Sequence, residues 1–388
     1  MAESATLAMA AKAREYRANG IDVISLSLGE PDFKTPKHIQ EGAKSAIDEE
    51  KYFAYPPVGG YLDLKQAIAK KFQKENGIQY GPEHIVVSNG AKQSIVNVMM
   101  SLVNPGDEVI VFSPFWVSYT AAVDLAEGKS VLIKGTIDND FKATAKQLQE
   151  AITPKTKVVI YSSPCNPTGS VFTEEELNAI ADVIRQHDGI YVISDEIYEH
   201  INYTGAHSSI ATIPGMWDRT ITVNGFAKGF AMTGWRVGYI GAPEWIANAC
   251  TKIQGQVTSA NASISQRAAL TALTSDLGPT HDMAREYEKR RQLVYDLLSD
   301  LPGFKTNMPS GAFYFFPDIS YYFGKSDGER TINNASDFCM YLLDNARVSL
   351  VTGEAFGDPN CIRLSYAASE SDLRTAIDNI RNAIKKLK

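Results

Sequence analysis

Four polar side chains that suit acid–base or covalent chemistry follow three apolar runs of the sequence. Asn166 follows the first run, Asp195 and Tyr198 follow the second, and Lys228 follows the third. Each of these apolar runs predicts a strand that is buried on both faces. Because ligands bind where the carboxyl ends of parallel strands meet, the sequence predicts that the four side chains share one pocket.

Lys228 lies among residues that carry no other charge, since its neighbours from 225 to 231 are glycine, alanine and phenylalanine. Apolar surroundings lower the pKa of an ammonium group and make the amine a nucleophile suited to Schiff-base formation. A lysine whose side chain extends from a loop into solvent is the alternative. The position at a strand end, beside the companion loops, favours the nucleophile.

Asp195 ends a buried strand, where an ionised carboxylate is costly unless it is paired. A structural cap or one half of a salt bridge would satisfy this carboxylate. A protonated ring nitrogen of a cofactor would be an equally good partner, and that pairing would turn the ring into an electron sink.

Other residues suit the binding of anions or flat rings. The segment 88–94 joins a strand to a helix through Gly90, and free N–H groups at a helix start bind phosphate. Trp116 follows the next strand and suits stacking on a ring, although tryptophan also fills cores. Arg236 and Arg363 lie in strand-like runs, where each needs a bound carboxylate, a bound phosphate or an internal salt bridge.

The elements that position these residues alternate between strands and helices. Apolar, β-branched runs predict strands at 84–88, 108–112, 130–133, 157–162, 190–194, 219–223 and 236–240. Helical spacing predicts helices at 92–103, 173–186 and 244–254. Near-continuous apolar runs are typical of a mostly parallel sheet with helices on both faces, so the predicted fold class is α/β.

The C-terminal part of the chain has a different pattern. It predicts a long charged helix at 282–301, strands at 312–317 and 361–366, and a final helix from residue 369. This is an α+β pattern, and the N-terminal 40 residues, with a strand at 21–28, precede the sheet. We therefore expect a large domain of residues 41–280 and a small domain made from residues 1–40 and 281–388.

Composition excludes several classes of protein. The 388 residues include 38 Lys and Arg against 45 Asp and Glu, and this net charge of −7 argues against a nucleic-acid or membrane-surface binder. The sequence has no apolar run of about 18 residues that would predict a membrane span. The 4 cysteines lie far apart without metal-ligand spacing, which indicates free thiols and no metal site. Since the first residues also lack a secretory pattern, we expect a cytoplasmic protein whose first segment belongs to the fold.

Taken in order, these motifs resemble the class I aminotransferases, fold type I enzymes that use pyridoxal 5′-phosphate (PLP). The resemblance covers essentially the whole chain. Its motifs are Ser27-Leu-Gly-Glu-Pro-Asp-Phe33, Tyr55-Pro-Pro-Val-Gly-Gly60, Ser113-Pro-Phe-Trp116, Asn166-Pro-Thr-Gly169, Ser194-Asp-Glu-Ile-Tyr198, Phe230-Ala-Met-Thr-Gly-Trp-Arg236 and Arg363-Leu-Ser-Tyr366. It implies a large PLP-binding domain with a mostly parallel sheet and a small α+β domain made from both chain ends.

The resemblance implies roles for the residues around the cofactor. Lys228 would form the Schiff base with PLP and move protons between the substrate Cα and the cofactor. Asp195 would pair with the pyridinium nitrogen. Tyr198 and Asn166 would hydrogen-bond the phenolic oxygen of PLP. Trp116 would stack on the ring, and both Trp116 and Asn166 would also border the substrate.

The resemblance also implies which residues bind anions. The phosphate would be held by Gly90, Ala91, Lys92 and Arg236. Tyr55 would reach the phosphate of the partner subunit, so the protein would be a homodimer with active sites at its interface. Arg363 would bind the substrate α-carboxylate beside the backbone of Gly29.

Within the family, the sequence is most similar to bacterial aspartate aminotransferases. In that subgroup, a lysine matched by Lys92 and a segment matched by Ser4-Ala-Thr6 meet the distal carboxylate of the substrate. The resemblance therefore implies ping-pong transfer of the amino group of L-aspartate to 2-oxoglutarate, which gives oxaloacetate and L-glutamate. Prephenate and aromatic substrates are the alternatives. Gly225 and Ala227 depart from the family pattern, since many members have serines there, and one phosphate contact is therefore absent.

Three other functional classes are alternatives to an aminotransferase. A PLP-dependent lyase, decarboxylase or synthase would share the cofactor residues, but only transamination gives a keto acid in every turnover. A non-catalytic PLP-fold regulator usually has a DNA-binding module, and the sequence has no basic helix of that kind. A nicotinamide dehydrogenase needs the G-x-G-x-x-G fingerprint, and this sequence lacks it, as it also lacks the P-loop motif.

Overall fold

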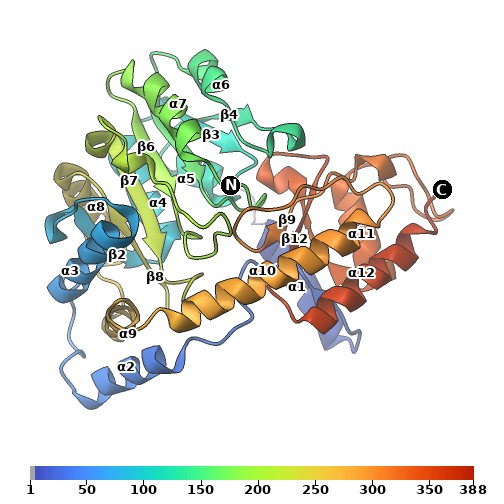
Figure 1. The fold of residues 1–388 in the computed structure, drawn as a ribbon, viewed down its shortest axis with the longest axis horizontal. Helices are drawn as coiled ribbons and strands as arrows, with labels where there is room; N and C mark the ends of the chain where they lie inside the picture. The colour runs from blue at the N-terminus through green and yellow to red at the C-terminus, as the bar shows by residue number, and fades with distance from the viewer. Residues whose placement is uncertain (1–4) are drawn as a thin grey trace.

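The computed structural model describes residues 5–388, and its largest element is a sheet of seven strands in the order β2-β8-β7-β6-β5-β3-β4 (Figure 1). The strands are β2 (Ile85–Asn89), β3 (Glu108–Ser113), β4 (Lys129–Lys134), β5 (Thr156–Ser162), β6 (Tyr191–Asp195), β7 (Thr220–Gly225) and β8 (Val237–Gly241). Strand β8 is antiparallel to its neighbours β2 and β7, and the pairs among β3, β4, β5, β6 and β7 are parallel. The predicted α/β class is confirmed, and all seven expected strands form.

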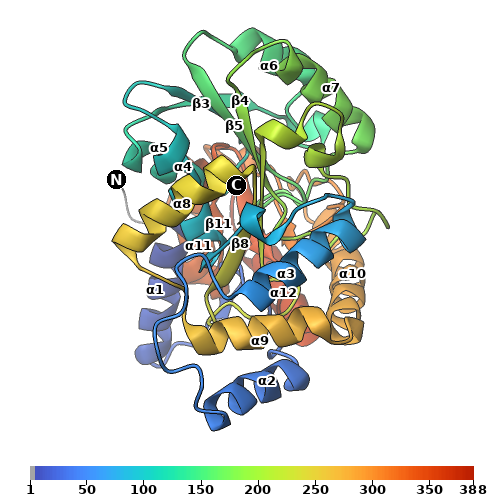
Figure 2. The same cartoon turned by 90° about the vertical axis from the view of Figure 1, so that its left-hand side faces the viewer.

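Helices cover both faces of this sheet because side chains alternate along each strand. In β3, Val109 and Val111 pack toward one face, and Ile110 and Phe112 pack toward the other. The first face is covered by α4 (Ala91–Leu102), α5 (Ser118–Leu125) and α8 (Glu244–Val257). The other face is covered by α6 (Ala145–Ala151), α7 (Glu174–Arg185), α3 (Leu62–Lys71) and α9 (Ser263–Thr274), with α2 (Lys37–Asp48) packed on α9 (Figure 2).

The remaining elements form a second, smaller group. Helix α10 (Gly278–Ser299) runs from beside α9 toward this group, which lies to the right in Figure 1. Its elements are α1 (Ala5–Ala18), β1 (Ile24–Ser25), β9 (Tyr314–Phe315), α11 (Ala335–Ala346), β10 (Val348–Ser349), β11 (Val351–Thr352), β12 (Ile362–Ser365) and α12 (Glu370–Ile384). Strand β1 pairs with β10, and β11, β12 and β9 form an antiparallel sheet, so both ends of the chain contribute to one core.

The carboxyl ends of β3, β5, β6 and β7 lie at one edge of the large sheet, together with the amino end of the antiparallel β8. The loops that follow or precede these strand ends therefore converge in space although they are far apart in the sequence. Within residues 5–388, no helix has both the length and the apolar character that a membrane crossing requires.

Candidate active site

Loops at this edge enclose a cavity of about 450 Å³, a volume typical of small-ligand sites. The predicted residues that line it are Gly29, Gly90, Ala91, Lys92, Trp116, Asn166, Asp195, Tyr198, Lys228, Arg236 and Arg363. Thr6 lines it as well, whereas Ser4 lies outside the described residues. Tyr55 does not line this cavity, and its side chain is 96% exposed.

Lys228 reaches the cavity from the turn after β7. Its Nζ donates a hydrogen bond to the carbonyl oxygen of Gly29 and lies 5.6 Å from the centre of the Tyr198 ring. Burial, together with the nearby charge of Arg363, lowers the pKa of Lys228 to about 8. About a tenth of this amine is therefore unprotonated and nucleophilic at pH 7, a far larger share than an exposed lysine provides.

Asp195 ends β6 and is only 4% exposed. Its Oδ2 accepts a hydrogen bond of 2.7 Å from the hydroxyl of Tyr119, and its Oδ1 accepts one of 3.3 Å from the backbone N–H of Ile197. Burial nevertheless raises the pKa of Asp195 to about 6. A cation placed in the cavity beside this carboxylate would stabilise its charged form.

Two tyrosines and a glycine form the wall beside Lys228. The hydroxyls of Tyr198 and Tyr314 are hydrogen-bonded at 2.6 Å, and both side chains are buried. Burial raises the pKa of each tyrosine above its ordinary value, so both phenols are neutral hydrogen-bonding groups at pH 7. A Cβ at Gly29 would collide with the hydroxyl of Tyr314, so glycine is needed for this close approach.

Arg363 enters the cavity from β12 and is 1% exposed. Its Nη1 donates to Asn166 Oδ1 at 3.0 Å, and its Nη2 donates to the carbonyl oxygen of Ser27 at 2.6 Å. The rings of Tyr314 and Phe356 lie within 5 Å of the guanidinium carbon. These contacts are to neutral groups, and Nε is buried without a hydrogen-bond partner in the described part of the chain. Arg363 therefore has a full positive charge available for an anionic ligand.

Gly90 and Arg236 form a cradle at the start of α4. Gly90 has a φ of +81°, and a Cβ there would collide with the Arg236 guanidinium. The sequence prediction that Arg236 lies within an apolar strand is wrong. Arg236 is exposed and has a φ of +58°, and β8 begins one residue later, so the guanidinium turns toward the Gly90 turn and donates to the carbonyl oxygen of Thr233 at 2.8 Å.

Lys92 lies in the first turn of α4, where a positive charge is unfavourable to the helix. Its Nζ lies 5.1 Å from the centre of the Trp116 ring, and burial lowers its pKa, as does the charge of Arg236. An anion in the cavity would offset both costs.

These residues fit PLP. The buried carboxylate of Asp195 suits a protonated ring nitrogen, and the cradle of Gly90 and Arg236 at a helix N-terminus suits a phosphate. The amine of Lys228 suits the carbonyl group of the cofactor, and Trp116 supplies a flat apolar surface for its ring.

Sequence reasoning did not identify several residues of the cavity or its walls. Tyr119 holds Asp195, Tyr314 holds Tyr198, and Arg14 lines the cavity from α1. Tyr314 lies in an apolar run that predicts a core position, and Tyr119 lies between Ser118 and Thr120 in no motif, so neither hydroxyl gave a signal. The Trp116 motif lies three residues before Tyr119 and was the signal nearest to it.

Comparison with known proteins identifies relatives over the full length. Residues 21–380 match the family described as aminotransferase class I and II. A protein of Petunia hybrida, named bifunctional aspartate aminotransferase and glutamate/aspartate-prephenate aminotransferase, is 46% identical over 99% of this chain and 81% of its own length. The crystal structure of an aspartate aminotransferase from Rhizobium meliloti is 39% identical with a TM-score of 0.96, over 100% of this chain and 98% of its own. The structure of Thermus thermophilus aspartate aminotransferase with maleate is 40% identical with a TM-score of 0.92, over 99% and 97%.

Proposed function

Because the chain belongs to the aminotransferase class I and II family, we propose that it transfers the amino group of L-aspartate to 2-oxoglutarate and gives oxaloacetate and L-glutamate. The observation that carries this proposal is that the residues needed for the reaction line one cavity. Lys228 and Asp195 lie there with two cationic side chains from different elements, Arg363 and Lys92. The cofactor is PLP.

The cofactor would be held by groups from five segments of the chain. We propose that Asp195 binds the ring nitrogen, that Tyr198 and Asn166 bind the phenolic oxygen, and that Trp116 packs on the ring. The phosphate contacts would be Gly90, Ala91, Lys92 and Arg236. Bound PLP supplies a carbonyl carbon that captures amines and a ring that accepts electron density.

Lys228 would be the acid–base group of the reaction. Its lowered pKa provides a free amine that would take the proton from the substrate Cα and pass it to the cofactor, and the reverse transfer would restore a Cα proton in the other half-reaction. The hydrogen bond from Tyr119 keeps Asp195 oriented, and the side chains of Tyr119 and Asp195 are both buried away from bulk water.

Arg363 would bind the substrate α-carboxylate through charge-assisted hydrogen bonds, beside the backbone of Gly29. Lys92, with Thr6, would meet the distal carboxylate. Two separated cations fit a dicarboxylic amino acid and its oxo acid better than they fit a substrate with one carboxylate. The maleate bound to the Thermus enzyme is also a dicarboxylate.

Replacing Lys92 by glutamine tests the substrate class. At saturating PLP we expect kcat/KM for aspartate to fall about 10- to 100-fold, since a hydrogen bond to a charged group contributes about 1.5–3 kcal/mol. Activity with alanine, which has no distal carboxylate, should change little. The measurement is steady-state kinetics over aspartate, glutamate, prephenate, aromatic amino acids and alanine.

The matched control is Lys146→Gln, because Lys146 lies exposed on α6 away from the cavity. An equal loss of kcat/KM with aspartate and with alanine would show that Lys92 does not bind the distal carboxylate. If kcat/KM for prephenate as amino acceptor exceeds that for oxaloacetate, the result would favour the second activity named for the Petunia relative. Prephenate has a second carboxylate in a similar place.

We also propose that the chain forms two domains, residues 41–280 and residues 1–40 with 281–388. The pairing of β1 with β10 supports a small domain built from both chain ends. Helix α2 begins at residue 37 and packs on α9, which supports a connection between the domains a few residues before the proposed boundary at 40. Since Arg363 comes from the small domain and Lys228 from the large one, closure would exclude water from the substrate.

A cytoplasmic location is our further proposal. All four cysteines are buried as free thiols. Free thiols without disulfides are typical of proteins in reducing compartments.

The exposure of Tyr55 supports a homodimer in which this residue completes the neighbouring active site. We expect light scattering on the purified protein to give twice the mass of the chain. Tyr55→Phe should keep the dimer and weaken PLP affinity about tenfold, because one hydrogen bond to the phosphate is lost.

Tyr321→Phe is the control for Tyr55, since Tyr321 is also exposed, at 56%, but lies in the C-terminal part. A stable, fully active monomer would contradict the proposal. PLP affinity that is unchanged in Tyr55→Phe would remove Tyr55 from the site.

A further inference from the structure

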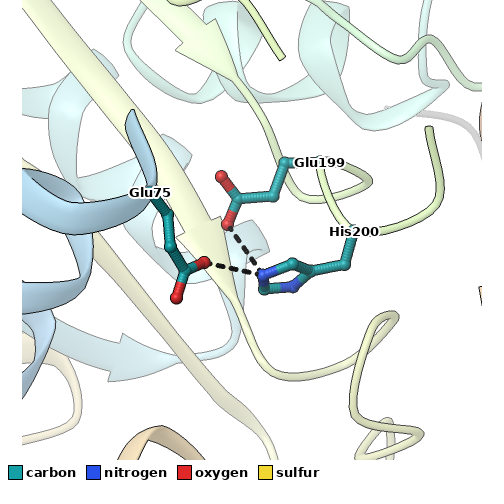
Figure 3. Close-up of side chains that lie close together, drawn as sticks. All are labelled: Glu75, Glu199 and His200. Carbon is teal, nitrogen blue, oxygen red and sulfur yellow. Dashed lines mark hydrogen bonds and ion pairs between the residues drawn. The ribbon is translucent and has the colours of Figure 1, made fainter. Parts of the chain in front are cut away.

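A cluster of charged and polar side chains, in which Lys71, Asn76 and Glu199 are buried, lies behind the turn that carries Lys228. We call it the Lys71 cluster, and its members are Lys71, Glu75, Asn76, Glu199 and His200. Lys71 ends α3, and the next two lie in the π-helical turn Phe72–Asn76 that follows. Glu199 and His200 come directly after Tyr198, in the segment that follows β6 (Figure 3).

The centre of the cluster is an ion pair between Lys71 and Glu199. Their side chains are 3% and 4% exposed, and Lys71 Nζ also donates to Asn76 Oδ1 at 2.8 Å. Asn76 Nδ2 donates to the second oxygen of Glu199 at 2.7 Å. Burial opposes ionisation of Glu199, but the charges of Lys71 and His200 outweigh it and hold its pKa well below the usual range.

The Lys71 ammonium indicates that the cluster is a network of ion pairs and not a metal-binding group. Glu75, Glu199 and His200 lie close enough together to resemble a metal-binding group. Lys71 Nζ binds Glu199 and lies 3.8 Å from Glu75, so its positive charge faces both carboxylates. The cluster therefore serves to fix the segments that contribute to it.

The π-helical turn explains how α3 reaches the cluster. A π-turn holds one more residue than an α-turn and occurs often at functional positions. Here it lets Glu75 and Asn76 both face the segment after β6 while α3 keeps Leu64 and Ile68 in the core. It ends at Gly77, whose φ is +71°.

His200 connects the cluster to the Lys228 turn. Its Nε2 lies 2.9 Å from Glu75 Oε2 and 3.8 Å from Glu199 Oε1. Dashed lines mark both contacts in Figure 3. Its ring packs against the backbone of Gly229, where a Cβ would come within 2.8 Å of His200 Nδ1 and 2.9 Å of its Cβ. The ring also meets the edge of Phe230, with centroids 5.4 Å apart.

We propose that His200 is a positioning residue for Lys228. Glu75 and the Lys71–Glu199 pair fix the imidazole, and the imidazole fixes the backbone of Gly229 and Phe230. Lys228 is the residue directly before them, so its Nζ keeps its place against the carbonyl oxygen of Gly29. The inference rests on the proposed function only in taking Lys228 as the reactive amine.

The test is His200→Ala in the holoenzyme, with two measurements. We expect kcat for transamination to fall about 10- to 100-fold with little change in KM, because the reacting amine is misplaced while Arg363 and Lys92 are unaffected. The backbone amides of Ala231 and Met232 donate to the carbonyls of Lys228 and Ala227. Their hydrogen exchange, followed by mass spectrometry on peptides covering 226–232, should become about tenfold faster.

His200→Gln provides the rescue, since its amide keeps a donor toward Glu75 and much of the ring volume. It should recover most of kcat and of the exchange protection. His187→Ala, two residues after α7 ends, is the matched control and should change neither. Glu75→Gln, which keeps the shape and removes one charge, should move both measurements in the same direction as His200→Ala and replaces it if that variant does not fold.

Unchanged exchange at 226–232 in His200→Ala or in Glu75→Gln would overturn the proposal. Faster exchange spread evenly over the large sheet would also overturn it, because it would show a general loss of stability. Exchange does not depend on the substrate. A wild-type protein inactive with aspartate would therefore contradict the proposed function while the exchange result still decides the role of His200.

Discussion

Replacing Lys228 by alanine is expected to abolish transamination, with a loss of at least about 10⁴-fold in kcat. The substitution removes the amine that lines the cavity and donates a hydrogen bond to the carbonyl oxygen of Gly29. The absorbance near the visible edge that a lysine-bound PLP gives should also disappear. Product formation is measured by chromatography of oxaloacetate and glutamate.

The control for this change is Lys252→Ala, an exposed lysine on α8. It should keep both the absorbance and the activity. Retention of full activity in Lys228→Ala would refute the proposed mechanism.

Because the pKa of Lys228 is lowered, the rate at which Lys228 captures PLP should depend on pH. Only the unprotonated amine captures a carbonyl, and its fraction rises tenfold per pH unit below the pKa. The apoprotein should therefore capture PLP faster as the pH rises, with a plateau above about 8. An exposed lysine would show no plateau before about pH 10.

Much of the fold follows from the sequence for a physical reason. A strand buried on both faces is mostly apolar, so β5 and β6 stand out by the apolar runs 158–161 and 191–193 between polar residues. Residues at the ends of such strands, including Asp195 and Lys228, could be assigned to one pocket because parallel strands present the same end to one edge.

Other parts of the site depend on contacts that no local pattern encodes. Arg236 was expected in a strand, but an antiparallel β8 begins just after it and leaves the guanidinium free to meet the Gly90 turn. The Lys71–Glu199 pair joins residues 128 positions apart, and each alone looks like an ordinary surface charge. The strands expected at 21–28 and 312–317 form only as the two-residue strands β1 and β9, because packing between the chain ends sets their length.

Asp195→Asn is expected to lower kcat about 10²- to 10⁴-fold. The amide keeps the shape of the side chain and the contact with Tyr119, but it removes the charge that would pair with the protonated ring nitrogen. Breaking a buried ion pair costs about 3–5 kcal/mol, and each 1.4 kcal/mol is about tenfold in rate. The control is Asp124→Asn on the exposed side of α5, which should leave kcat unchanged.

The same substitution should have the opposite effect on the stability of the apoprotein. Burial raises the pKa of Asp195 to about 6, whereas in the unfolded chain it is about 4. Between about pH 4 and 6 the unfolded chain loses this proton first, so wild-type stability falls relative to Asp195→Asn as the pH rises through that window. Above about pH 6 the difference should level off near 3 kcal/mol in favour of the variant, as measured by urea unfolding. An apoprotein that Asp195→Asn destabilises at pH 8 would show that the carboxylate already has a cationic partner within the chain, and the assignment of that partner to the cofactor ring would fail.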